Sequence, residues 1–231
     1  MRQPRVHIAI PGNQTPYPVY SRAERLADAV LHILGILFSL IAVPVMVTLA
    51  AVWYGDMGTV AAALVYGASM IAMFTLSACY HMVRHGRAKQ FLRRLDHAAI
   101  YVKIAGTYTP FAVLLAGQDT VPILAGIWGA ALLGAVLKIT VPDRFETLSL
   151  AIYLVMGWGA VVIGGPIIEH ITHATFMMML TGGGLYTLGI VFLYWDRLRF
   201  HNAIWHGFVL AASFVFYFAI LTEVSLLAPG K

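Results

Sequence analysis

Apolar residues in this chain come in long runs, which predicts helices embedded in lipid rather than amphipathic elements of a soluble fold. A helix needs about 20 predominantly apolar residues to cross a bilayer. Only the short polar stretch 142–146 separates the fourth run from the fifth, so six spans are an alternative to seven. The pattern predicts an all-α integral membrane protein with seven transmembrane helices, at approximately residues 27–53, 59–83, 97–116, 121–140, 147–168, 174–194 and 203–226.

The composition excludes an ordinary soluble domain. Hydrophobic residues make up 60% of the chain, charged residues only 11%, and the mean hydropathy is +0.81, whereas soluble domains carry about 25% charged residues. Residues 1–26 hold four arginines and four prolines without the short apolar core of a cleavable signal. We therefore expect a retained cytoplasmic tail over residues 1–26, followed by a single transmembrane domain over residues 27–231.

Basic residues lie on alternate connections between the predicted spans. Segment 84–94 holds five Lys and Arg residues and the tail holds four, whereas the first, third and fifth loops hold none. Because cytoplasmic loops are enriched in Lys and Arg, this pattern predicts a cytoplasmic amino terminus and an external carboxyl terminus. The sequence pI near 9.4 then reflects loops lying against anionic membrane lipids, and nucleic acid is not an expected partner.

Polar residues lie near the cytoplasmic ends of three predicted spans, and His81, Asp96 and His206 are predicted to lie at similar depth there. Ser77 and His81 share a face at the end of the second span, Asp96 begins the third, and His206 lies early in the seventh. Ionisable groups at membrane depth are costly and usually functional, although a cap is the ordinary reading of Asp96 alone. Two imidazoles and a carboxylate suit a zinc site with an open position for substrate. The weaker alternative makes Ser77 a nucleophile and His81 its base, without a nucleophile elbow.

The motifs SACYH, RRLDHAAIYVKIAGTYTPF and AIWHGFVLAAS occur in this order across the seven predicted spans. Together they resemble the hemolysin III family, the bacterial branch of the progestin and adipoQ receptor family, which is similar in turn to alkaline ceramidases. The resemblance covers the chain from about residue 23 onward. It implies a bacterial inner-membrane protein with seven helices around a zinc site facing the cytoplasm. The family pattern is matched at Ser77, His81, Asp96 and His206.

One family position differs, because the resemblance implies a histidine four residues before His206, and Asn202 stands there. His201 is five residues before His206, so the two point about 140° apart on a regular helix and do not face one pocket. An amide is a poor zinc ligand. Asp96 binding the metal, His201 swinging in from an unwound turn, Asn202 positioning a water, and loss of the metal all stay open. We favour a site made of His81, Asp96 and His206.

Three further ionisable residues lie within the predicted spans. Lys103 is seven residues after Asp96 on the same helix face, so it either snorkels toward the inner surface or has a buried role, in anion binding or proton relay. We expect His32, in the first span, to be a hydrogen-bonded core residue. Glu223, near the outer end of the last span, is expected to be interfacial.

Two functions from different classes follow from these residues. In the first, zinc assists hydrolysis of a lipid amide or ester that enters from the inner leaflet, with Asp96 deprotonating water and Ser77 assisting the oxyanion. In the second, the metal is structural, Lys103 and Asp96 form a charge relay, and the protein is a membrane sensor or an ion-handling or cytolytic protein. Membrane lipids are the expected partners in both.

Overall fold

The computed structural model describes residues 7–8, 17–18, 20–83, 86–141, 146–163 and 165–227. These residues are almost entirely helical, apart from two short antiparallel strands, β1 (His7–Ile8) and β2 (Tyr17–Pro18), and a 3-10 turn at Gly117–Asp119. The α-helices are α1 (Arg22–Trp53), α2 (Met57–Met82), α3 (Arg87–Leu115), α4 (Thr120–Thr140), α5 (Glu146–Ile163), α6 (Gly165–Ile168), α7 (His173–Tyr194) and α8 (His201–Leu226).

Each predicted apolar stretch is helical over its described residues, and the fifth comprises α5 and α6, which lie on either side of residue 164, outside the described residues. Of the described residues, six helices are long and apolar enough to cross a membrane, while α5 contributes a shorter apolar segment, Leu148–Gly159. Helix α3 begins ten residues before the predicted span. Its first turns carry four basic residues, which a hydropathy criterion does not register, and it starts after Gly86, whose φ of 106° favours glycine.

Polar side chains close the amino ends of several helices. Ser21 and Glu24 form a capping box at α1, in which the Glu24 backbone N–H donates to Ser21 Oγ at 3.2 Å and the Ser21 N–H donates to Glu24 Oε2 at 2.9 Å. At α2, Asp56 Oδ1 accepts from the Thr59 N–H at 2.9 Å. These caps set where the helices begin, and short connections make consecutive helices antiparallel neighbours.

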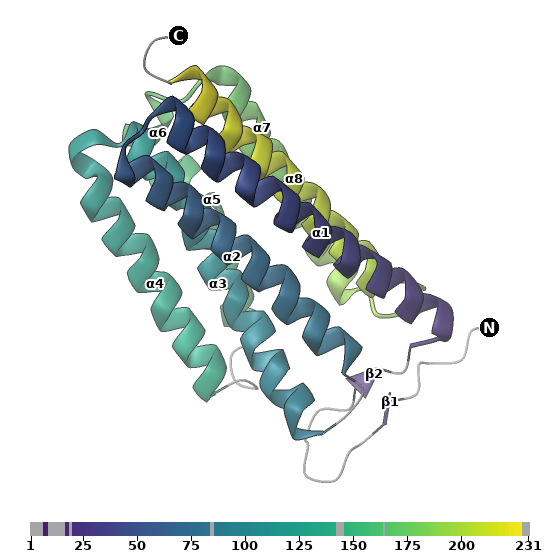
Figure 1. Cartoon of the computed structure of the whole chain (residues 1–231). Helices are drawn as coiled ribbons and strands as arrows, with labels where there is room; N and C mark the ends of the chain where they lie inside the picture. Colours follow the sequence, from purple (N-terminus) through teal and green to yellow (C-terminus); the bar gives the residue numbers. More distant parts are fainter. Residues whose placement is uncertain are drawn as a thin grey trace.

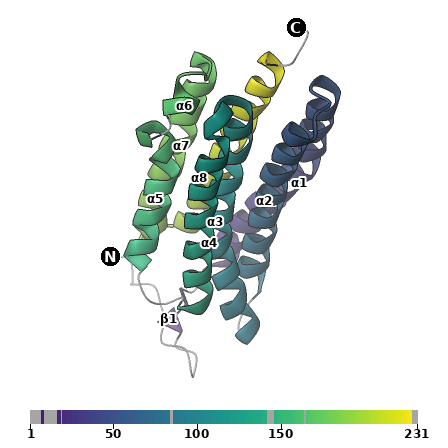
Figure 2. The ribbon, with the colours of Figure 1, turned by 90° about the vertical axis from the view of Figure 1, so that its left-hand side faces the viewer.

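The helices form a bundle in which α3 is central, because it contacts α2, α4, α5, α6 and α8. Helix α1 packs against α2 and α8, and α7 packs against α8. Figure 1 shows that α1, α3 and α8 start at the same end of the bundle, where α2 ends. Figure 2 shows the layers from the side, with α5 and α6 on the opposite flank from α1 and α2. Residues early in α1, α3 and α8 can therefore meet residues late in α2.

The larger apolar core fills the space between α1, α2, α3 and α8, around Met46, Tyr66 and Met70. Close approach of α1 to α2 depends on Gly67, where an added Cβ would overlap the side chain of Val43. Large apolar side chains on the outer faces of α1 and α4 are exposed, including Ile41 and Leu133. Such surfaces suit contact with lipid tails.

Candidate metal centre

Three histidines from three helices converge at the end of the bundle where α1 and α8 begin. His32 of α1, His81 of α2 and His206 of α8 each offer one ligand nitrogen, and these nitrogens all lie within 4.8 Å of one another. The ring centroids are 4.4 Å apart for His32 and His206, 4.6 Å for His81 and His206, and 5.2 Å for His32 and His81. His32 and His206 are buried and His81 is partly buried.

The Asp28 carboxylate lies against all three rings. It is one turn before His32 on the same face of α1. Its Oδ1 is 2.6 Å from His206 Nδ1 and accepts from Asn202 Nδ2 at 3.1 Å. Its Oδ2 is 3.4 Å from His81 Nδ1 and 3.5 Å from His32 Nε2. A buried carboxylate of this kind can orient the imidazoles that surround it: His206 Nδ1 lies at hydrogen-bond distance, and the other two rings lie within ion-pair distance.

A contact between α1 and α8 outside the histidine group sets the relative position of the two helices. The Phe200 backbone N–H donates to Glu24 Oε1 at 3.2 Å, which ties the residue before α8 to the first turn of α1. Phe200 has a φ of 63°, a left-handed conformation that turns the chain sharply into α8. Glu24 therefore both caps α1 and holds the start of α8 beside it.

The donor set fits a divalent transition metal. An imidazole whose Nδ1–H donates to a carboxylate keeps its Nε2 lone pair free for a metal, and the short contact from His206 to Asp28 has this form. His32 Nε2 is buried and has no hydrogen-bond partner among the described residues, a costly condition that metal bonding would relieve. In tetrahedral sites with metal–nitrogen bonds of about 2.0–2.1 Å, ligand nitrogens are about 3.4 Å apart, and the three nitrogens here lie within 4.8 Å of one another.

The structure brings together two of the three predicted ligands, His81 and His206, and places His32 beside them. His32 is buried as expected and lies 3.5 Å from Asp28 through Nε2, but its ring also packs on both other histidines, so it belongs to the same group. Asp96 is not one of the three grouped residues; it is partly buried and accepts a hydrogen bond from Ser77.

The two residues at the start of α8 point in different directions. Asn202 faces the centre, with its Nδ2 atom 3.1 Å from Asp28 Oδ1 and 3.4 Å from His81 Nδ1. His201 contacts other groups, with Nε2 3.5 Å from the Tyr20 hydroxyl and Nδ1 3.3 Å from the Phe192 carbonyl oxygen. His201 and His206 therefore do not converge, as their spacing of five residues predicts.

Lys103 is buried away from the histidines. Its Nζ donates to Thr107 Oγ1 at 2.9 Å and lies 4.3 Å from the centroid of the Tyr66 ring. Thr107 is one turn further along α3, so the lysine is directed away from the end that carries the three histidines rather than snorkelling toward it. The recorded contacts of Lys103 do not include Asp96, and the proposed relay between these two residues gains no support from them.

Asp28 was not singled out from the sequence, although a signal for it exists. Asp28 and His32 are four residues apart in an apolar helix, the same spacing that drew attention to Ser77 and His81. Two polar residues on one face of a membrane helix indicate a polar partner inside the bundle. What the spacing does not reveal is that α1 packs between α2 and α8.

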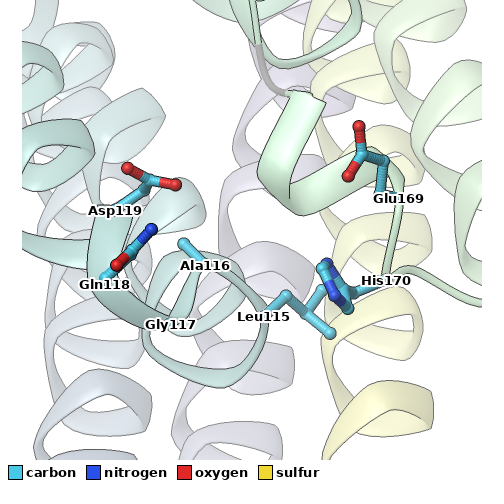
Figure 3. A pocket seen from close by; sticks show the side chains of 7 residues that line it. All are labelled: Leu115, Ala116, Gly117, Gln118, Asp119, Glu169 and His170. Carbon is cyan, nitrogen blue, oxygen red and sulfur yellow. The ribbon is translucent and has the colours of Figure 1, made fainter.

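A second polar region lies around the turn after α3 and the segment after α6. A cavity of about 340 Å³ is lined there by Asp119, Gln118, Glu169 and His170. Figure 3 shows the first two on one side and the other two across from them. Within the described part of the chain, these residues form no group with metal-ligand spacing.

Glu223, expected at the membrane interface, is fully buried instead. Its Oε1 atom accepts from the Thr172 N–H at 3.0 Å and from the Thr172 hydroxyl at 2.6 Å. Through Oε1 the carboxylate thus joins the end of α8 to the amino-terminal cap of α7, while its Oε2 is buried and has no hydrogen-bond partner among the described residues.

Comparison with known proteins identifies the family. The family described as Haemolysin-III related matches residues 21–217. The chain is 37% identical to the hemolysin-3 homolog of Bacillus subtilis, over 88% of this chain and 95% of that protein. It is 38% identical to hemolysin-3 of Bacillus cereus, over 87% and 92%, and 30% identical to the human monocyte to macrophage differentiation factor, over 68% of each chain. The chain is therefore a multi-pass membrane protein that belongs to the haemolysin-III-related family.

Proposed function

We propose that this protein is a zinc-dependent hydrolase that cleaves an amide or ester bond of a membrane lipid. The observation that carries the proposal is the group of His32, His81 and His206 around the Asp28 carboxylate, with a buried His32 nitrogen that has no hydrogen-bond partner among the described residues. Three histidine ligands leave the fourth position of a tetrahedral zinc site open, as in catalytic rather than structural zinc sites.

A zinc ion bound by the three histidines would supply a Lewis acid that polarises the scissile carbonyl and lowers the pKa of a water molecule. Asp28 holds the His206 ring through Nδ1 and lies close to the other two rings. Asn202 donates to the same carboxylate and helps to fix its orientation. In this proposal Asn202 is a positioning residue, which explains how the family's histidine can be replaced by an amide.

Asp96 and Ser77 are suited to proton transfer beside the metal. Ser77 is one turn before His81 on the same face of α2, and it hydrogen-bonds to Asp96. We assign Asp96 as the general base that takes a proton from water as the water oxygen bonds to the carbonyl carbon. Asp96 then returns the proton to the leaving nitrogen or oxygen as the carbon–heteroatom bond breaks, giving an acid and an amine or alcohol. In the proposed step the single Ser77 O–H turns from Asp96 to the carbonyl oxygen and donates to it as negative charge develops there.

The substrate class follows from the surroundings of the centre. The three histidines lie inside an apolar bundle at the end where α3 starts with a run of basic residues. The basic loops favour the cytoplasmic side for this end, so a lipid would enter from the inner leaflet. The polar head of such a lipid would lie at the depth of the histidines, with its acyl chain in the membrane.

A second candidate function is membrane permeabilisation, which the names of the two Bacillus relatives, hemolysin-3 homolog and hemolysin-3, favour. In that case the metal would be structural. Dye release from lipid vesicles that requires the three histidines, without hydrolysis of any lipid, would support this candidate over the hydrolase.

The first experiment measures metal content by inductively coupled plasma mass spectrometry on protein purified in detergent. We expect about one zinc per chain, and loss of the zinc in His32→Ala, His81→Ala and His206→Ala. His201→Ala is the matched control, because His201 lies on the same helix as His206 but makes other contacts. Full zinc content in His32→Ala would exclude the ligand set proposed here.

The second experiment measures lipid hydrolysis. Purified protein is incubated with ceramide and lysophospholipid, and the released fatty acid is quantified by mass spectrometry. Asp96→Asn should keep its zinc and lose at least about 100-fold in rate, the usual contribution of a general base. Unchanged hydrolysis in Asp96→Asn would show that Asp96 is not the base, and absence of hydrolysis by the zinc-loaded parent on any lipid would count against the hydrolase.

A further inference from the structure

An elongated cavity of about 400 Å³ lies between α3, α4, α5, α7 and α8, and none of the three histidines lines it. Its walls are mostly apolar and aromatic, but they include two lysines, Lys103 of α3 and Lys138 of α4. Both lysines are 4% exposed. Buried lysines in an apolar cavity are unusual, because a charged side chain at membrane depth is costly.

The polarity of the cavity changes along its length. Near the end of the bundle that carries the histidines, the lining includes His97, Lys138 and Ser149; further along come Lys103 and Thr107. The far part is lined by apolar side chains such as Phe111. A cationic end followed by an apolar stretch matches a molecule with an anionic head and a hydrocarbon tail.

The cavity is long enough for an acyl chain together with its head group. His97 and Phe111 both line it and are 14 residues apart on α3, so it extends over about 21 Å. One leaflet of the hydrocarbon core is only about 15 Å thick, so this length holds a head group as well as a tail.

The Lys103 ammonium group has N–H donors that could bind an anion. An ammonium group has three N–H donors. The recorded contacts of Lys103 are one hydrogen bond to Thr107 and the face of the Tyr66 ring, and no carboxylate contacts it within the described part of the chain. Lys138 adds a second positive charge to the same cavity. An anionic head group would satisfy the remaining donors of Lys103 and balance the buried charge.

We propose that this cavity binds a lipid with an anionic head group and an acyl chain. The head group contacts Lys103 and Lys138, and the acyl chain lies along the apolar part of the cavity past Phe111 toward Met179 and Phe216. The binding site is distinct from the histidine group, and the proposal does not depend on hydrolysis there.

The test compares two lipids that share a chain and differ in the head group. Radiolabelled 1-palmitoyl lysophosphatidate and 1-palmitoyl lysophosphatidylcholine are titrated into the full chain in phosphatidylcholine nanodiscs. The anionic lipid should bind saturably at about one molecule per chain and at least tenfold more tightly than the zwitterionic lipid, as expected for hydrogen bonds to a charged group. Equal affinities for the two lipids would overturn the proposal.

Lysine variants test whether the lipid binds in this cavity. Lys103→Met should weaken lysophosphatidate binding at least about tenfold, and Lys103→Arg should retain it, because the arginine keeps the charge. The matched control is Lys89→Met, since Lys89 is also on α3 but donates to the Tyr80 and Val83 carbonyl oxygens outside the cavity. If Lys103→Met and Lys89→Met weaken binding equally, the lipid is held by general surface charge and the proposed site is wrong.

A second measurement covers the case in which Lys103→Met does not fold. Trp158 and Trp205 both line the cavity. Lysophosphatidate with a brominated acyl chain should quench tryptophan fluorescence saturably in the parent, and this component should disappear when both tryptophans are replaced by phenylalanine. Saturable quenching that persists in the double variant would place the lipid elsewhere and overturn the proposal.

Discussion

Replacing Asp28 by alanine removes the carboxylate that contacts all three histidines. The change deletes the 2.6 Å contact to His206 Nδ1 and the hydrogen bond from Asn202 at 3.1 Å. A hydrogen bond to a charged group is worth about 1.5–3 kcal/mol, and water entering the gap would recover part of the loss. Outer-shell carboxylates at metal sites contribute about 10–100-fold in affinity. Because Asp28 contacts more than one ring, we expect Asp28→Ala to reach the upper end of this range. Zinc binding should be about 100-fold weaker, which corresponds to a loss of about 2.7 kcal/mol of binding free energy.

The assay is equilibrium competition for zinc with a chromophoric chelator, using the parent, Asp28→Ala and Asp28→Asn. The asparagine variant keeps an oxygen that can accept from His206 Nδ1, so it should lose only about tenfold. Asp56→Ala is the control, since Asp56 caps α2 outside the centre and should leave the affinity unchanged. Zinc affinity of Asp28→Ala within twofold of the parent would refute the role assigned to this carboxylate.

Three further predictions concern acid, the α2 cap and helix packing. Bound zinc should dissociate as the pH falls from 7 to about 5, because protons compete for imidazole nitrogens; metal content after dialysis at each pH measures this, and full retention at pH 5 would contradict a histidine site. The hydrogen bond from the Thr59 N–H lowers the pKa of Asp56. Its ionised form therefore stabilises the fold above about pH 4 and this contribution is lost as the pH falls through the lowered pKa, so Asp56→Ala should reduce the thermal midpoint at pH 7 but not in strong acid. Gly67→Leu should greatly reduce the yield of monodisperse protein in size-exclusion chromatography, because the side chain overlaps Val43, whereas Gly126→Leu, which meets no atom within 4 Å, should not.

Most helix positions could be predicted because each membrane-spanning helix corresponds to an apolar run of sufficient length in the sequence. The prediction missed the first turns of α3, since these residues are basic and the helix extends beyond the apolar part. Hydropathy measures how apolar a segment is and carries no information on helix caps or on polar turns that extend a helix beyond its apolar part.

The candidate centre could be predicted only in part. His81 and His206 were expected at one level because antiparallel spans return their ends to the same side, and they meet in the structure. His32 and Asp28 were not assigned to the centre, because their inclusion depends on α1 packing between α2 and α8. That arrangement is a long-range contact, and spacing within α1 shows only that the two residues share a face.

For Lys103, too, the sequence predicted a local property but not the contacts that depend on distant helices. Its position in the third span predicted a costly buried charge, with snorkelling and a buried role as alternatives. The structure directs it to Thr107 and into the cavity between α3, α4, α5, α7 and α8. Whether Lys103 snorkels or is buried depends on the cavity formed by these helices, which are distant from one another in sequence.

The central claim is that His32, His81 and His206 bind one zinc ion, and a zinc K-edge X-ray absorption spectrum tests it most directly. The protein is loaded with one equivalent of zinc, and the outer-shell scattering is used to count imidazole ligands. We predict three imidazoles with zinc–nitrogen distances of about 2.0–2.1 Å in the parent, and two in His32→Ala. A count of two imidazoles in the parent that does not change in His32→Ala would contradict the account. It would indicate that Asp96, and not His32, is the third zinc ligand.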